Sequence, residues 1–72
     1  MKLFYFKYFG QCGDFAIVGA NNKEEAYNTL CNYRHLSNNV NLINEDSCIE
    51  LPNCYTYTKG NKPIVIIEKF FG

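Results

Sequence analysis

The sequence predicts an α+β fold in which ββα is followed by two or three strands, giving a small antiparallel sheet with one helix packed on one face. Three observations predict it. A dense run of β-forming residues opens the chain, a helical pattern follows a second strand, and the last third holds short β-rich runs separated by Gly, Pro and Asn. With 72 residues, the chain has room for a single domain, 1–72.

The first two strands are predicted to form a hairpin. Residues 2–9 are rich in Phe and Tyr, Gly10 and Gly13 supply turn geometry, and residues 14–20 form the second strand. Side chains alternate along a strand, so Phe4, Phe6 and Tyr8 point to one side while Leu3, Tyr5 and Phe9 point to the other. Because neither face is polar, one helix leaves an apolar face uncovered.

A helix is predicted from about residue 22 to about residue 36. Asn21 is a good N-cap, and Glu24 stands three residues later, where a capping-box carboxylate is expected. Arg34 falls inside the apolar stripe, where it either lays its stem on the sheet near the helix C-terminus or clamps an anion at the sheet edge. The stripe at 3.6-residue periodicity contains Ala26, Tyr27, Leu30 and Tyr33, with Cys31 at its margin.

The last third is predicted to end in a second hairpin. The Asn-rich residues 37–46 form a loop, and a short strand over 48–51 is stopped by Pro52 and Asn53. Residues 55–58 and 64–67 then flank a Gly- and Asn-containing tip at 59–63, which is a strong hairpin pattern.

The charge balance excludes several classes of function. Seven Lys and Arg oppose seven Asp and Glu. Electrostatic binding to nucleic acid needs a basic surplus and mimicry of DNA an acidic one, so we expect no direct nucleic-acid binding. No apolar run approaches the 18 or so residues that cross a bilayer, so no membrane partner is expected.

The cysteines are expected to be reduced and free of metal. Cys12, Cys31, Cys48 and Cys54 include no C-x-x-C pair, and the first residues lack the apolar core of a secretion signal. This pattern favours a cytosolic protein, with a zinc site or structural disulfides as the alternatives.

Catalysis is not expected. Cys31 and His35 are four residues apart on the predicted helix and could face each other, but a buried cysteine beside a surface histidine explains the spacing without chemistry. We therefore predict a non-enzymatic protein without a cofactor.

One group of residues in the predicted hairpin suits a nucleotide. Tyrosines two apart provide ring faces for a base, and the adjoining tip supplies ammonium groups for a phosphate. The alternative is half-buried sheet packing with solubilising lysines. The predicted ligand residues are Tyr55, Tyr57, Lys59, Asn61 and Lys62, with Arg34 as a possible third cation.

The two ends of the chain resemble small bacteriophage or prophage proteins. The resemblance rests on the opening MKLFYFKY, on FAIVGA running into NNKEEA, and on the closing KPIVII. It implies a counter-defence protein in the cytosol of the host cell. The resemblance and the hairpin residues together favour a sponge that sequesters a nucleotide-derived immune signal, and the alternatives are an inhibitor that binds a host defence protein, of the anti-CRISPR type, and a plain structural or interaction domain.

The uncovered apolar face also predicts a homo-oligomer, most simply a twofold dimer. Aromatic residues on both faces of the first and last strands leave one side without a helix to cover it.

Overall fold

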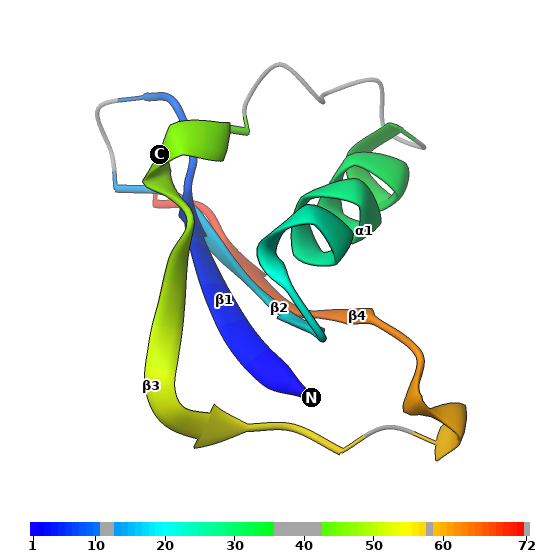
Figure 1. Cartoon of the computed structure of the whole chain (residues 1–72). Helices are drawn as coiled ribbons and strands as arrows, with labels where there is room; N and C mark the ends of the chain where they lie inside the picture. The colour runs from blue at the N-terminus through cyan, green and yellow to red at the C-terminus, as the bar shows by residue number, and fades with distance from the viewer. Residues whose placement is uncertain (11–12, 36–42, 58, 72) are drawn as a thin grey trace.

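The computed structural model describes residues 1–10, 13–35, 43–57 and 59–71. Within them, one helix lies on one side of a four-stranded antiparallel sheet, which confirms the predicted α+β fold (Figure 1). The strands stand in the order β3-β1-β2-β4. The elements are β1 (Lys2–Lys7), β2 (Phe15–Ala20), α1 (Lys23–His35), β3 (Ile49–Tyr55) and β4 (Ile64–Lys69), with short 3-10 turns η2 (Glu45–Ser47) and η3 (Lys59–Asn61).

The core lies between α1 and the sheet face that α1 covers, which we call the inner face. Here Phe4, Phe6 and Tyr8 of the first hairpin are almost fully buried, as the alternation predicts. Ala26 and Leu30 of α1 are fully buried against them, whereas Tyr33, predicted in the same stripe, is half exposed. The buried hydroxyl of Tyr8 donates a hydrogen bond to the carboxylate of Glu68 on β4, so the core also ties β1 to an edge strand.

The start of α1 is capped one residue later than the sequence suggests. The Asn22 side-chain oxygen accepts a hydrogen bond from the Glu25 N–H at 2.8 Å, and the Glu25 carboxylate accepts one from the Asn21 N–H at 3.0 Å. Both Asn21 and Asn22 are good caps, and Glu24 and Glu25 are equally good partners, so composition could not choose between the two registers. The observed register starts the helix at Lys23.

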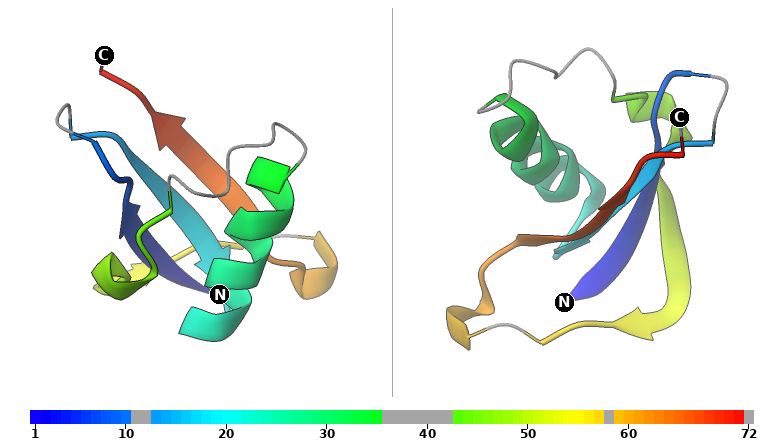
Figure 2. Two further views of the ribbon diagram at one scale, coloured as in Figure 1. Left: turned by 90° about the horizontal axis from the view of Figure 1, so that it is seen from above. Right: turned by 180° about the vertical axis from the view of Figure 1, so that it is seen from behind.

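The predicted second hairpin is wrong. β3 pairs with β1 and β4 pairs with β2, so the two strands lie at opposite edges of the sheet (Figure 2). The predicted tip does form a turn, because Gly60 and Asn61 adopt left-handed conformations with φ of 75° and 53°. The flanking strands are nevertheless separated, since the hydrogen bonds of the first hairpin leave one free edge on β1 and another on β2, and each edge takes one strand.

β3 also runs past the point where Pro52 and Asn53 were expected to stop it. The strand continues to Tyr55, but its register with β1 jumps from Leu3–Leu51 to Lys2–Tyr55. Pro52 has no N–H to donate and Asn53 has a φ of 60°, so the expected break takes the form of a bulge inside an edge strand.

Candidate functional site

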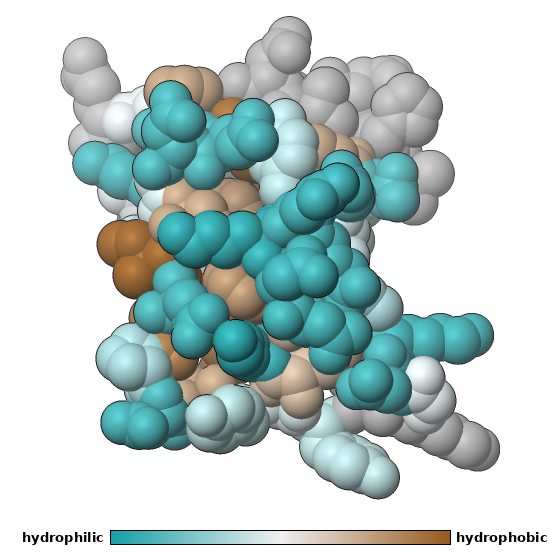
Figure 3. Space-filling model, viewed as in Figure 1, coloured by the Kyte–Doolittle hydropathy of each residue, from teal (hydrophilic) through white to brown (hydrophobic). Residues whose placement is uncertain are grey.

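The sheet face opposite α1, which we call the outer face, is covered by no helix of the described residues (Figure 2). Figure 3 shows the other side of the molecule, where polar side chains spread over α1 and hydrophobic ones reach the surface at the β3 edge.

A row of three residues crosses the outer face at the end where β1 and β4 finish. Lys7 pairs with Phe15, and Phe15 pairs with Lys69, so the three side chains lie side by side on neighbouring strands. Adjacent strands are about 4.8 Å apart, which puts the two lysine Cα atoms about 10 Å from each other with the Phe15 ring between them.

Two further rings adjoin this row. Tyr5 and Phe15 are stacked with ring centroids 5.4 Å apart, and Phe71 lies 6.2 Å from Phe15. The Lys69 ammonium is 5.8 Å from the centroid of Phe71, whose backbone N–H donates to the Asp14 carboxylate at 2.9 Å. We call Tyr5, Lys7, Phe15, Lys69 and Phe71 the aromatic–lysine cluster.

The cluster has the polarity that an aromatic anion requires. Glu50 pairs with Phe4 and Glu68 with Ala16, so both strand carboxylates belong to the inner face. Lys7 and Lys69 therefore face an aromatic surface, where one ring can stack on a base and two ammonium groups can meet phosphate oxygens. The Asp14 carboxylate borders this surface and accepts a hydrogen bond from the Phe71 N–H.

The rest of the outer face is aliphatic. Ile49, Ile64, Ile66 and Ile67 keep 43 to 55% of their surface exposed. Thr56 closes the far end, because its methyl group lies over Gly19, only 2.5 Å from where a Cβ on Gly19 would stand. We call this surface the aliphatic patch, and it consists of Leu3, Ile17, Ile49, Leu51, Ile64, Ile66 and Ile67.

The structure places the ligand residues predicted at 55–62 at the end of β3 and in the connection that leads to β4. Tyr55 ends β3, Tyr57 follows it, and Asn61 and Lys62 lie at and after η3 in the connection to β4. Tyr55 and Tyr57 are 71 and 97% exposed, so the alternative of half-buried packing is wrong for both. The Lys59 side chain lies outside the described part of the chain.

Arg34 is separated from the rest of that predicted site. The connection reaches the sheet at Gly19, close to where α1 starts, and Arg34 is in the last turn of α1. A helix rises about 1.5 Å per residue, so the Arg34 backbone is roughly 17 Å along α1 from its start. Its side chain lies outside the described residues, and its role as a third cation stays a prediction.

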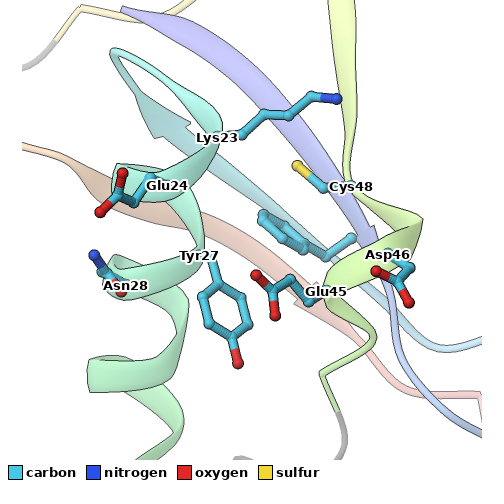
Figure 4. Close-up of a pocket in the computed structure, with 8 residues that line it drawn as sticks. Lys23, Glu24, Tyr27, Asn28, Glu45, Asp46 and Cys48 are labelled. Atoms are coloured by element: carbon cyan, nitrogen blue, oxygen red, sulfur yellow. The ribbon is translucent and has the colours of Figure 1, made fainter.

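A second concave feature lies between α1 and η2, with a volume of about 670 Å³ (Figure 4). η2 is held against β1 because the Lys7 N–H donates to the Ser47 hydroxyl at 2.8 Å. Figure 4 shows the Lys23 side chain extending toward Cys48 and the Tyr27 ring beside Glu45. The groove is lined by Phe6, Lys23, Glu24, Tyr27, Asn28, Glu45, Asp46 and Cys48.

The groove has the wrong polarity for a phosphate. Its carboxylates, on Glu24, Glu45 and Asp46, outnumber its one ammonium group, on Lys23. Two residues of the groove have raised pKa values. Burial raises the pKa of the Cys48 thiol, which the Lys23 ammonium partly offsets. A hydrogen bond with Cys31 raises the pKa of Tyr27.

The described thiols give no further site, and Cys12 lies outside the described residues. Cys31, Cys48 and Cys54 are free thiols, and within the described ranges no three His, Cys, Asp or Glu side chains are placed to hold a metal ion. Cys31 contacts Tyr27, whereas the side chain of its predicted neighbour His35 is outside the described part. None of the described helices is long and apolar enough to cross a membrane.

Sequence reasoning missed the aromatic–lysine cluster because its members come from both ends of the chain. The signal was present in the alternation, which already places Tyr5 opposite the buried face of β1. The register of β2 with β4, which the sequence leaves open, brings Lys69 to Phe15.

Comparisons with protein-family models, with curated proteins and with solved structures find no match to this chain.

Proposed function

We propose that this protein binds and sequesters a nucleotide-type ligand without turning it over, and that the ligand binds at the aromatic–lysine cluster. The observation that supports the proposal is the cross-strand row in which Phe15 stands between Lys7 and Lys69. This is the pairing of ring face and ammonium that the sequence placed at residues 55–62, and the sheet assembles it elsewhere.

The cluster has both elements that a nucleotide needs. Phe71 keeps 58% of its surface exposed, so a base can lie against it or against Phe15. The two lysines project from different strands, so they can approach a phosphate from two sides. A host signalling nucleotide of this chemistry fits a counter-defence role, in agreement with the resemblance of the sequence to small phage proteins.

The test is calorimetric titration of linear and cyclic nucleotides into the wild type and into two matched pairs of variants. One charge-assisted contact contributes about 1.5 to 3 kcal/mol, so Lys7→Ala or Lys69→Ala should weaken binding by about ten- to a hundredfold. The matched controls are Lys62→Ala and Tyr57→Ala, which remove a lysine and a ring from the site predicted by sequence.

We expect both controls to bind as the wild type does. Because Tyr57 is 97% exposed, Tyr57→Ala should also leave the melting temperature unchanged, contrary to what half-buried packing predicts. Loss of binding in the controls but not in Lys7→Ala would return the site to residues 55–62. If the wild type binds no nucleotide, the proposal fails and an inhibitor that binds a host defence protein becomes the better hypothesis.

A further inference from the structure

The aliphatic patch is not used by the proposed ligand site. It begins in the row next to Lys7, Phe15 and Lys69, and four of its isoleucines stay about half exposed. Its own side chains are all aliphatic and uncharged, and the Tyr5 ring lies among them because Tyr5 pairs with Ile17 and Ile49. Such a surface favours an apolar occupant, because a polar partner would lose hydrogen bonds to water without replacing them.

We propose that a second copy of this chain covers the aliphatic patch, in a twofold dimer whose sheets face each other with their strands running in opposite directions. The rows formed by Lys7, Phe15 and Lys69 then lie at the open ends of the dimer, while Tyr5 lies at the border of the covered surface. Two copies supply the same uncharged surface to each other, and the formal net charge of zero means that no long-range repulsion opposes their approach.

The lysines determine the direction of the strands in this dimer. If the two lysine ends met, four ammonium groups would face one another across sheets about 10 Å apart, and the Asp14 carboxylate of each copy, which is bonded to the Phe71 N–H, would offset their charge only in part. Reversing one copy moves the two lysine pairs to opposite ends, roughly 20 Å apart. That distance is beyond the screening length of about 8 Å at physiological salt, so the repulsion disappears.

The size of the patch sets the strength of the association. Four strands at about 4.8 Å and about four residues at about 3.4 Å give a plan area on the order of 300 Å². Side-chain relief adds to this area, but it stays below the roughly 800 Å² per partner of a standard interface. We therefore expect a weak association, so that the dimer forms only at raised concentration.

Sedimentation velocity over a concentration series from the low micromolar range to about 200 μM tests this proposal. The wild type should pass from monomer to dimer, while Ile67→Glu and Ile49→Glu should stay monomeric because each places a charge in the patch. Tyr33→Glu is the matched control, since it puts the same charge on a half-exposed residue of α1 and should dimerise normally. Far-ultraviolet circular dichroism shows that each variant is folded.

The double variant Lys7→Gln, Lys69→Gln tests whether the strands of the two copies run in opposite directions. In the antiparallel dimer the dissociation constant should change less than twofold, whereas lysine ends in contact would make the variant associate at least tenfold more tightly. A wild type that stays monomeric at 200 μM, or that dimerises with Ile67→Glu and Ile49→Glu unaffected, overturns the proposal. Dimerisation that is lost in Tyr33→Glu but kept in both isoleucine variants also overturns the proposal.

Discussion

Phe15 is close to Lys7 in the sequence and far from Lys69, yet both lysines are its direct cross-strand neighbours. Each of the three residues has an ordinary explanation when taken alone, because aromatics favour strands and lysines keep strand ends soluble. Only their shared row gives them a binding chemistry. At the scale of the residue, the proposed binding therefore depends on a pairing register and not on any unusual side chain.

Cys48 allows a test of the electrostatics of the groove. Burial raises the pKa of its thiol, and the Lys23 ammonium lowers it in part. Alkylation followed by peptide mass spectrometry over a pH series should therefore label the exposed Cys54 first and Cys48 only at higher pH. Lys23→Ala should move the labelling of Cys48 to still higher pH, and labelling that ignores this substitution would contradict the placement of Lys23.

The raised pKa of Cys48 also determines whether the stability of the fold rises or falls with pH. The folded protein holds the Cys48 proton more tightly than the unfolded chain does, because burial raises the pKa in the folded state. The contribution of this thiol to stability is therefore fully present below the ordinary pKa of a cysteine. It is lost as the pH rises through the raised folded value.

At the scale of the element, local patterns predicted what each segment is but not where it pairs. β1, β2 and α1 follow from residue propensity, side-chain alternation and a capping box, which are all short-range signals. The positions of β3 and β4 in the sheet depend on which free edge of the first hairpin each strand pairs with. The tip at Gly60 and Asn61 has the chemistry of a hairpin turn, and nothing near it in the sequence shows that its flanking strands separate.

For the candidate site, too, the sequence predicted the local features but not how they come together. The sequence indicated an aromatic surface with nearby ammonium groups, and it also indicated that one sheet face lacks a covering helix. It assigned the binding chemistry to residues 55–62 because those residues are contiguous. Contiguity cannot reveal the aromatic–lysine cluster, since neighbouring strands place residues from opposite ends of the chain in one row. The site at residues 55–62 stays a prediction.

A substitution at Gly19 on β2 tests where the connection between β3 and β4 crosses the outer face. A Cβ at this position would stand 2.5 Å from the Thr56 methyl and 3.6 Å from both Ile64 and Ile66. Gly19→Ala should therefore lower the free energy of unfolding by about 1 to 3 kcal/mol. Thr56→Ser removes the obstructing methyl, so the double variant should recover most of that loss in urea denaturation. Equal effects of Gly19→Ala with and without Thr56→Ser would show that Thr56 does not lie over Gly19.

At the scale of the whole molecule, the asymmetry between the two sheet faces is the dominant feature. Among the described residues, the buried core consists of side chains of the inner face and α1 together with Ile43, while the outer face holds the aliphatic patch and two lysines. A chain of this length buries only about 60% of its unfolded surface, so stability is marginal. Covering the outer face would add burial where four isoleucines of a single copy are about half exposed.

The sheet order predicts how protection from hydrogen exchange is distributed. β1 and β2 have neighbours on both sides, whereas β3 and β4 each have one. Exchange followed by mass spectrometry at low micromolar concentration should therefore show the slowest amides in β1 and β2, and faster exchange in β3, whose pairing is interrupted by the bulge. Uniform protection across all four strands would argue against this order.

The position of β1 in the middle of the sheet also has a consequence for synthesis on the ribosome. Tyr5 finds its β3 partner only at Ile49, and Ile17 finds its β4 partner only at Ile67. The N-terminal hairpin and α1 are therefore made well before either of its edges can be closed, and loop closure over such separations is slow. For that interval the nascent chain displays two unpaired strand edges beside an apolar surface, so its yield in the cell depends on how long translation of the last third takes.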